Sequence, residues 1–251
     1  MSYRKPQASF RRLRHHGAVR EYWSKRGALP APRFSVLRGA LLASPLVGSS
    51  TLSGPFETSR GFGVTFREAG CARVVDRFAE LAPWFDAVLG APGVRALTPW
   101  WRRKLTRVPN CWYLNVLLVS PGGTVARHID ATLRKPSGVE DAVPEVVSVL
   151  YLTVPAKAGG ELLLWEGPNA IAKLVPEENA VLHFRGDLAH EVCAFEAAPG
   201  ALRASLVIEQ YFFEDAALAR LPEFQLESRA GFGAFLKHHS RRAPTEFDVE
   251  P

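Results

Sequence analysis

The chain has 251 residues, of which 47% are hydrophobic, and a formal net charge of +6. This length and apolar content predict one large domain with an ordinary buried core. Three cysteines without C-x-x-C spacing exclude a disulfide framework and a zinc site of that type, and no uncharged apolar stretch is long enough to span a membrane. We therefore expect a soluble protein of a reducing compartment, the cytoplasm.

The first 33 residues are rich in cations and contain a single acid, Glu21. No apolar signal-peptide core follows them, so secretion is not expected. A solvated basic arm or helix is the simplest interpretation, and an Arg-rich organellar transit sequence, although serine is scarce here, is the alternative. An excess of positive charge favours anionic partners, whether nucleic acid or an acidic small substrate.

Between Glu68 and Leu89 apolar residues recur at steps of three and four. This spacing predicts a helix, or two helices broken at Pro83, whose apolar stripe packs on the outside of a sheet. Trp100 and Trp101 follow in an aromatic and basic segment. They are expected to cover the sheet, and contact with a substrate is the alternative.

The centre of the chain predicts eight short strands separated by Gly, Pro and Asn turns, with no crossover helix between them. Runs of this kind close into two facing sheets. The predicted fold class is therefore mainly β with flanking helices, a double-stranded β-helix of the jelly-roll or cupin-like type. The strands are expected at Trp112–Val119, Thr124–Ile129, Val146–Thr153, Glu161–Trp165, Ala170–Leu174, Ala180–Phe184, His190–Phe195 and Ala204–Phe213.

The segments around this core divide the chain into three parts of one structural domain. Residues 1–105 are expected to form the basic arm and a helical support, residues 106–213 the core, and residues 214–251 a helical and basic tail. The loop Ala131–Glu145 is a candidate substrate lid, because it lies beside the polar residues considered next.

Two of those residues, His128 and Asp130, are separated by one position. On an extended strand their side chains point to the same face. His190 begins a later strand-like run, and His183, in Ala180–Phe184, is the alternative third residue. Two histidines and one carboxylate on one face of a metal form the ligand set of non-haem Fe(II) oxygenases.

Arg203 and Ser205 lie on one face of the last predicted strand, where a guanidinium beside a hydroxyl suits a dicarboxylate. With these residues the sequence resembles the 2-oxoglutarate/Fe(II)-dependent dioxygenase superfamily, most closely its prolyl-4-hydroxylase-like branch. The matching pieces, in chain order, are Pro121–Gly123, His128–Asp130, Val147–Thr153, Gly159–Leu164, Leu188–Val192 and Arg203–Ser205.

The resemblance implies a role for each matching side chain. His128, Asp130 and His190 would hold Fe(II), and the keto-acid end of 2-oxoglutarate would chelate the metal. The distal carboxylate of 2-oxoglutarate would pair with Arg203, helped by Ser205 and by the hydroxyl of Tyr151.

Two positions depart from the family pattern. Val119 stands where the family often has a tyrosine, and two residues rather than one separate Gly200 from Arg203. The first removes one polar contact, and the second changes the spacing that leads into the last strand.

The implied reaction converts 2-oxoglutarate and O2 to succinate and CO2 while a C–H bond of an amino acid, a peptidyl residue or a related small metabolite is hydroxylated. An AlkB-like nucleic-acid demethylase is a first alternative, but that branch carries a second arginine six residues after the co-substrate arginine, and here Glu209 stands there. Nucleic acid is therefore not an expected partner. A non-catalytic β-roll binding module is the second alternative, and the sequence leaves the oligomeric state open.

Overall fold

The computed structural model describes residues 20–52, 54–56, 58–98, 107–155, 158–230 and 236–240. Most of the predicted basic arm, Trp100 and Trp101, and the end of the tail lie outside the described residues.

A large antiparallel sheet forms the centre of the described structure. Its strands follow the order β1-β10-β6-β13-β4-β3-β14-β15, and β2 pairs with β3. In chain order these strands are β1 (Tyr22–Lys25), β2 (Gly48–Ser49), β3 (Arg60–Arg67), β4 (Cys111–Val119), β6 (Val146–Thr153), β10 (Val181–Arg185), β13 (Arg203–Tyr211), β14 (Phe224–Ser228) and β15 (Leu236–Ser240).

A smaller antiparallel sheet with the order β5-β11-β8-β9 faces the large one. The two sheets share an apolar core between them. The strands are β5 (Val125–His128), β8 (Leu162–Glu166), β9 (Asn169–Leu174) and β11 (Ala189–Val192), and a short pair, β7 (Ala158–Gly159) with β12 (Phe195–Glu196), lies apart from both sheets. Each of the eight predicted strands corresponds to an observed one, so the predicted jelly roll is confirmed.

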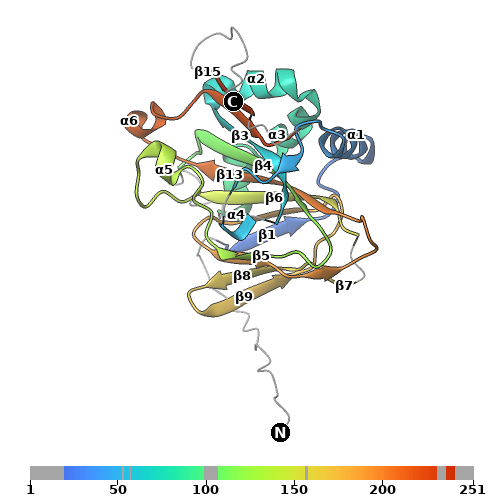
Figure 1. The fold of residues 1–251 in the computed structure, drawn as a ribbon. Helices are drawn as coiled ribbons and strands as arrows, with labels where there is room; N and C mark the ends of the chain where they lie inside the picture. Colours follow the sequence, from blue (N-terminus) through green and yellow to red (C-terminus); the bar gives the residue numbers. More distant parts are fainter. Residues whose placement is uncertain are drawn as a thin grey trace.

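Helices cover the other face of the large sheet, as Figure 1 shows, with α1, α2 and α3 on one side and β5, β8 and β9 on the opposite side. They are α1 (Ala31–Leu42), α2 (Cys71–Arg77), α3 (Ala82–Val88) and α4 (Ala91–Leu97). The predicted interruption is confirmed, but the first helix ends before Phe78 and Pro83 lies in the first turn of α3, where its missing N–H costs nothing. None of the helices in the described ranges is long and apolar enough to cross a bilayer.

Strand β13 separates the two cores because its side chains alternate between the faces of the large sheet. Ala204, Leu206 and Ile208 belong to the core beneath the helices. Arg203, Ser205, Val207 and Glu209 line a cavity between the two sheets. The alternation therefore places charged side chains in an otherwise apolar space.

The N-terminal part is more than the predicted arm and helices, because β1 and β3 also belong to the large sheet. The pattern of β3 was obscured by two glycines, which usually weaken a strand. A Cβ on Gly63 would lie 2.4 Å from the hydroxyl of Tyr113, and one on Gly61 would lie 1.6 Å from the carbonyl oxygen of Val116. Both glycines are needed because β4 approaches them closely.

The prediction of a helical tail was wrong. After one short helix, α6 (Asp215–Leu218), the chain forms β14 and β15, and β14 pairs with β3. Phe224 and Leu226 are buried in the helix-side core, so the period of two outweighed the charge of this segment. The division of the chain into three parts stays a prediction.

Candidate metal centre and adjoining cavity

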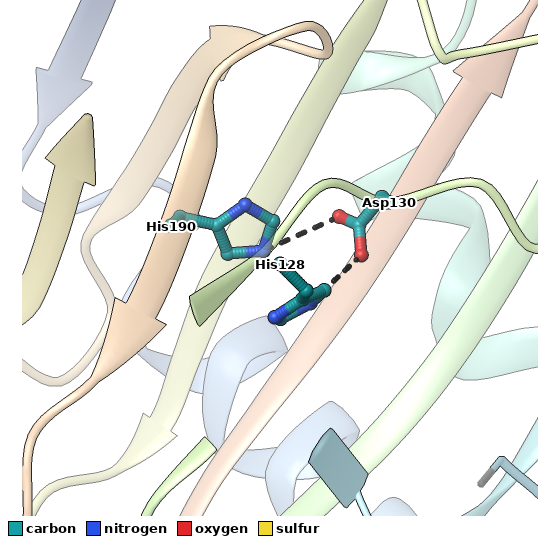
Figure 2. Close-up of side chains that lie close together, drawn as sticks. All are labelled: His128, Asp130 and His190. Atoms are coloured by element: carbon teal, nitrogen blue, oxygen red, sulfur yellow. Dashed lines mark ion pairs between the residues drawn. The ribbon is translucent and has the colours of Figure 1, made fainter. Parts of the chain in front are cut away.

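His128, Asp130 and His190 meet between the two sheets. His128 ends β5 and is the direct ladder partner of His190 on β11, while Asp130 lies two residues beyond β5. Figure 2 shows both rings beside the Asp130 carboxylate, whose oxygens lie 3.2 Å from His128 Nε2 and 3.5 Å from His190 Nε2. One ligand atom from each residue lies within 4.8 Å of the others, so the three side chains can hold one metal ion.

The backbone sets the direction of both imidazoles. His128 Nδ1 lies 2.7 Å from the carbonyl oxygen of Ala126, and His190 Nδ1 lies 3.3 Å from that of Leu188. A ring nitrogen that faces a carbonyl carries the proton, which leaves the Nε2 lone pair free for a metal. His128 Nε2 and Asp130 Oδ2 are buried without a hydrogen-bond partner among the described residues. Two imidazoles and one carboxylate are a donor set that fits Fe(II).

Burial and the neighbouring side chains shift the pKa values of all three residues. Burial raises the pKa of Asp130, but the two neighbouring imidazoles, His190 first and then His128, outweigh it, so the net pKa lies below the ordinary value. Burial lowers the pKa of His190. It also lowers that of His128, but Asp130 more than compensates and the net pKa is raised. Asp130 is thus held as a carboxylate and His190 as a neutral imidazole, the forms that bind metals.

The metal cluster opens into a cavity between the sheets. Most of its wall is apolar, which excludes water and strengthens electrostatic interactions inside. The polar residues of the wall outside the metal cluster are Asn115, Tyr151, Arg203, Ser205 and Glu209.

Arg203 is 2% exposed, yet its Nε and Nη1 have no hydrogen-bond partner, and no described carboxylate forms an ion pair with it. Its guanidinium carbon lies 5.4 Å from the centre of the Tyr151 ring, and the Tyr151 hydroxyl is also buried without a partner. Ser205 is the ladder partner of Tyr151, on the same face of the sheet. An unpaired buried cation costs several kcal/mol, so this end of the cavity is suited to an anion.

The structure shows where the two departures from the family pattern lie. Val119 is the ladder partner of Arg203, so the position lacks a hydroxyl beside the guanidinium. The extra residue before Arg203 leaves its register with β4 regular, and an irregularity falls instead on the β6 side, between Ala204 and Ser205. The predicted glycine pair is required there too, since a Cβ on Gly159 would lie 2.2 Å from the carbonyl oxygen of Ala194.

His183, the alternative third ligand, lies outside the metal cluster. It is 3% exposed, its Nδ1 lies 2.8 Å from the Ser148 hydroxyl, and its ring stacks on Trp23. Burial lowers its pKa to about 4. The structure therefore gives His183 a set of partners of its own and leaves His190 with His128 and Asp130.

Glu209, Asn115 and Phe56 also line the cavity but were not predicted as site residues. Glu209 and Asn115 are polar side chains inside apolar strands, and Glu209 follows Arg203 at the period of two, a signal present in the sequence. Phe56 packs edge-on against the ring of His128 with the centroids 4.8 Å apart. It comes from a distant short helix, η1 (Gly54–Phe56), so no local pattern could have indicated it.

Glu209 is a fully buried acid with several partners. It accepts hydrogen bonds from the Thr132 hydroxyl at 2.7 Å, from the Thr132 backbone N–H at 3.3 Å, and from the Tyr211 hydroxyl. Burial, with the negative charge of Asp130, raises the pKa of Glu209 to about 8. Glu209 therefore joins the strand that carries Arg203 to the chain just after Asp130.

The predicted lid, Ala131–Glu145, begins at this contact. It contains the short helix α5 (Arg134–Ser137), and Leu133 and Ala142 are buried with Tyr211. The loop is thus packed near both ends, and its role as a lid stays a prediction.

No family model matches the chain, and no curated protein matches it in sequence. Solved structures do match it. A prolyl-4-hydroxylase from Pseudomonas putida aligns at 19% identity over 77% of this chain and 94% of its own, with a TM-score of 0.52. A prolyl hydroxylase from Trichoplax adhaerens, in complex with a hypoxia inducible factor oxygen degradation domain peptide fragment, aligns at 17% identity over 79% and 86%, with a TM-score of 0.52. The chain has the prolyl-hydroxylase fold.

A third structure, IDO from Bacillus thuringiensis, aligns at 11% identity over 77% of this chain and 94% of its own, with a TM-score of 0.50. The prolyl-hydroxylase fold is the double-stranded β-helix of 2-oxoglutarate/Fe(II) oxygenases, so the predicted resemblance in fold is confirmed. At these identities the likeness concerns architecture, and the chemistry must be argued from the residues of this chain.

Proposed function

We propose that the protein is an Fe(II)- and 2-oxoglutarate-dependent dioxygenase that hydroxylates a C–H bond of an amino acid, a peptidyl residue or a related small metabolite. The observation that carries this proposal is the presence, in one cavity, of the His128, Asp130 and His190 cluster and the unpaired guanidinium of Arg203. A ligand triad alone suits many metal proteins. A buried cation beside it calls for a bound anion that also reaches the metal.

Each polar group of the cavity has a role in this proposal. His128, Asp130 and His190 hold Fe(II). The guanidinium of Arg203 binds the distal carboxylate of 2-oxoglutarate through paired N–H donors, and the hydroxyls of Tyr151 and Ser205 add hydrogen bonds to the same end. When bound, Fe(II) and 2-oxoglutarate supply the oxidising chemistry, in which 2-oxoglutarate and O2 become succinate and CO2.

The remaining contribution of the chain is orientation and a dry environment. The carbonyl oxygens of Ala126 and Leu188 keep both Nε2 lone pairs directed at the metal. The apolar cavity wall excludes water, so the attraction between Arg203 and a carboxylate is stronger than it would be at the surface.

Features of the cavity weigh against both alternatives. A buried carboxyl group, Glu209, stands where the AlkB-like branch has its second arginine, so the position offers no cation to an anionic ligand. A non-catalytic β-roll would gain nothing from burying Arg203 without a partner. The peptide bound by the Trichoplax relative supports, for this chain, a peptidyl substrate. A cytoplasmic location stays part of the proposal.

An anaerobic titration of the purified apoprotein with Fe(II) and 2-oxoglutarate tests the proposal. We expect a weak visible metal-to-ligand charge-transfer band in the wild type and in His183→Ala, and no band in His190→Ala. Succinate release from 2-oxoglutarate under air then serves to screen substrates. A folded wild type that shows no band contradicts the oxygenase proposal and favours the binding module.

A further inference from the structure

Asp130 lies beyond the part of its strand that the sheet holds. The ladder between β5 and β11 ends with the pair His128 and His190, and β5 itself ends at His128. Asp130 follows two residues later, where no strand pairing fixes the backbone. A ligand carboxylate needs a defined direction to hold a metal, so something outside the ladder must fix this segment.

The nearest fixed point is Glu209. Its carboxylate accepts hydrogen bonds from both the hydroxyl and the backbone N–H of Thr132, at 2.7 and 3.3 Å, and we call these two bonds the Glu209–Thr132 clamp. The Tyr211 hydroxyl donates a third hydrogen bond to Glu209. Glu209 itself is 3% exposed on β13, which is paired along its length with β4 and β6. The clamp thus ties the backbone two residues after Asp130 to the most extensively paired strand of the large sheet.

We propose that Glu209 is a positioning residue of the metal centre, which fixes the direction of the Asp130 carboxylate through Thr132. The proposal rests on the metal site proposed above. Glu209 lies on β13, and the histidine ligands lie on the small sheet, so the clamp also sets the carboxylate against ligands from the opposite sheet. Without it, the contacts described for the Asp130 carboxylate are those with His128 and His190, which it must share with a metal.

If Glu209 acted on the metal centre directly, through its own charge in the cavity wall, the dependence on Thr132 would differ. If Glu209 acts through the clamp, then removing Thr132 as well as Glu209 adds little to the loss. If Glu209 acts by its charge alone, the two substitutions affect metal binding independently and their effects multiply.

The test is a double-mutant cycle with Co(II) as the probe, whose visible d–d absorption reports affinity and coordination geometry without turnover. The variants are Glu209→Met, Thr132→Val and the two combined, with Glu209→Gln as the conservative variant. We expect Glu209→Met to raise the Co(II) Kd about 10- to 100-fold, the range for groups that orient metal ligands. Thr132→Val should raise it less, the double variant should match Glu209→Met, and Glu209→Gln should restore part of the loss.

Gln210→Met is the matched control, because Gln210 is the adjacent buried polar residue and points to the opposite face of the sheet. It should lower the melting temperature but leave the Co(II) Kd and spectrum unchanged. An unchanged Kd in Glu209→Met, independent effects in the cycle, or an equal loss in Gln210→Met would each overturn the inference while the metal site stands. A wild type that binds no Co(II) would overturn the metal site as well.

Discussion

The large sheet buries polar side chains on both of its faces, but the two groups differ in how they are satisfied. On the helix side, Gln210 accepts hydrogen bonds from Gly90 N–H at 2.9 Å and Trp112 Nε1 at 3.3 Å, and donates to the Ser148 hydroxyl at 3.0 Å. Ser148 in turn contacts His183 Nδ1 at 2.8 Å. Gln210 also donates to the Val88 carbonyl oxygen at 3.0 Å, so this helix-side network ties the end of α3 and the start of α4 to the sheet.

On the cavity side, by contrast, several buried polar groups lack hydrogen-bond partners. Arg203, Tyr151, His128 and Asp130 each have at least one buried polar atom without a partner among the described residues. Buried polar groups in proteins are normally paired, because an unpaired group costs about 1–3 kcal/mol and a charge more. Four of the unpaired side chains thus gather in the candidate site, whereas His183 belongs to the hydrogen-bonded helix-side network and His190 lies with His128 and Asp130.

Replacing Arg203, the buried cation on the cavity side, should produce the largest change in 2-oxoglutarate binding. We expect Arg203→Met to weaken 2-oxoglutarate binding by roughly 3 kcal/mol or more, about 100-fold or more in Kd, because the co-substrate would lose its counter-charge. The free energy of unfolding should stay equal or rise, since an unpaired buried cation is removed. Anaerobic titration of the Fe(II) protein and urea unfolding measure the two quantities. A destabilised variant with unchanged Kd would make Arg203 an architectural residue.

A substitution on the helix side should have the opposite effect, a loss of stability without a loss of binding. Gln210→Met should lower the free energy of unfolding by about 3 kcal/mol, because Gly90 N–H and Trp112 Nε1 would be left buried without an acceptor. The Kd for 2-oxoglutarate should not change. Ile208→Val, a neighbour that loses only packing, serves as the control and should cost about 1 kcal/mol. Equal losses in the two variants would show that the network contributes no more than packing.

The helix-side network should also give stability a dependence on pH. Burial lowers the pKa of His183 from 6.5 to about 4 in the folded protein, so the unfolded chain takes up the proton first. The contribution to stability is therefore complete above pH 6.5 and is lost as the pH falls toward 4, by about 3 kcal/mol in total. Urea unfolding of the wild type and His183→Gln between pH 7.5 and 4.5 should give curves that converge at low pH. Parallel curves would contradict this assignment.

The smallest effect concerns a single hydroxyl. Tyr151→Phe should raise the Kd for 2-oxoglutarate about 5- to 10-fold, since one hydrogen bond is worth about 1 kcal/mol, and should leave the free energy of unfolding unchanged. Tyr113→Phe is a matched control, because the Tyr113 hydroxyl is also buried without a described hydrogen-bond partner but does not line the cavity. The control should bind 2-oxoglutarate as the wild type does. Equal Kd values for wild type and Tyr151→Phe would remove Tyr151 from the co-substrate site.

The sequence predicted those parts of the fold in which local pattern and tertiary structure agree. The eight central strands carry the period of two between Gly, Pro and Asn turns, and His128 with Asp130 form a pair within three residues. Strand β3 escaped prediction because Gly61 and Gly63 resemble strand breakers until the close approach of β4 is known. The tail was mistaken for helix because its charge obscured the alternation in β14.

The candidate site was predictable only to the extent that its residues lie in recognisable motifs. The Glu209–Thr132 clamp joins a central strand to a loop 77 positions away in the chain, and Phe56 reaches His128 from a separate short helix. Neither pairing follows from composition or periodicity, because each depends on which strands become neighbours.

The position of β13 has a consequence for folding. This nine-residue strand lies between β4 and β6, both of which precede it by many residues in the chain, and it pairs with β4 along its whole length. While the chain is being synthesised, β4 and β6 each wait with an open edge until Arg203–Tyr211 has left the ribosome. Long-range pairing of this kind slows folding and exposes strand edges to aggregation. A chaperone that shields those edges should therefore increase the yield of folded protein.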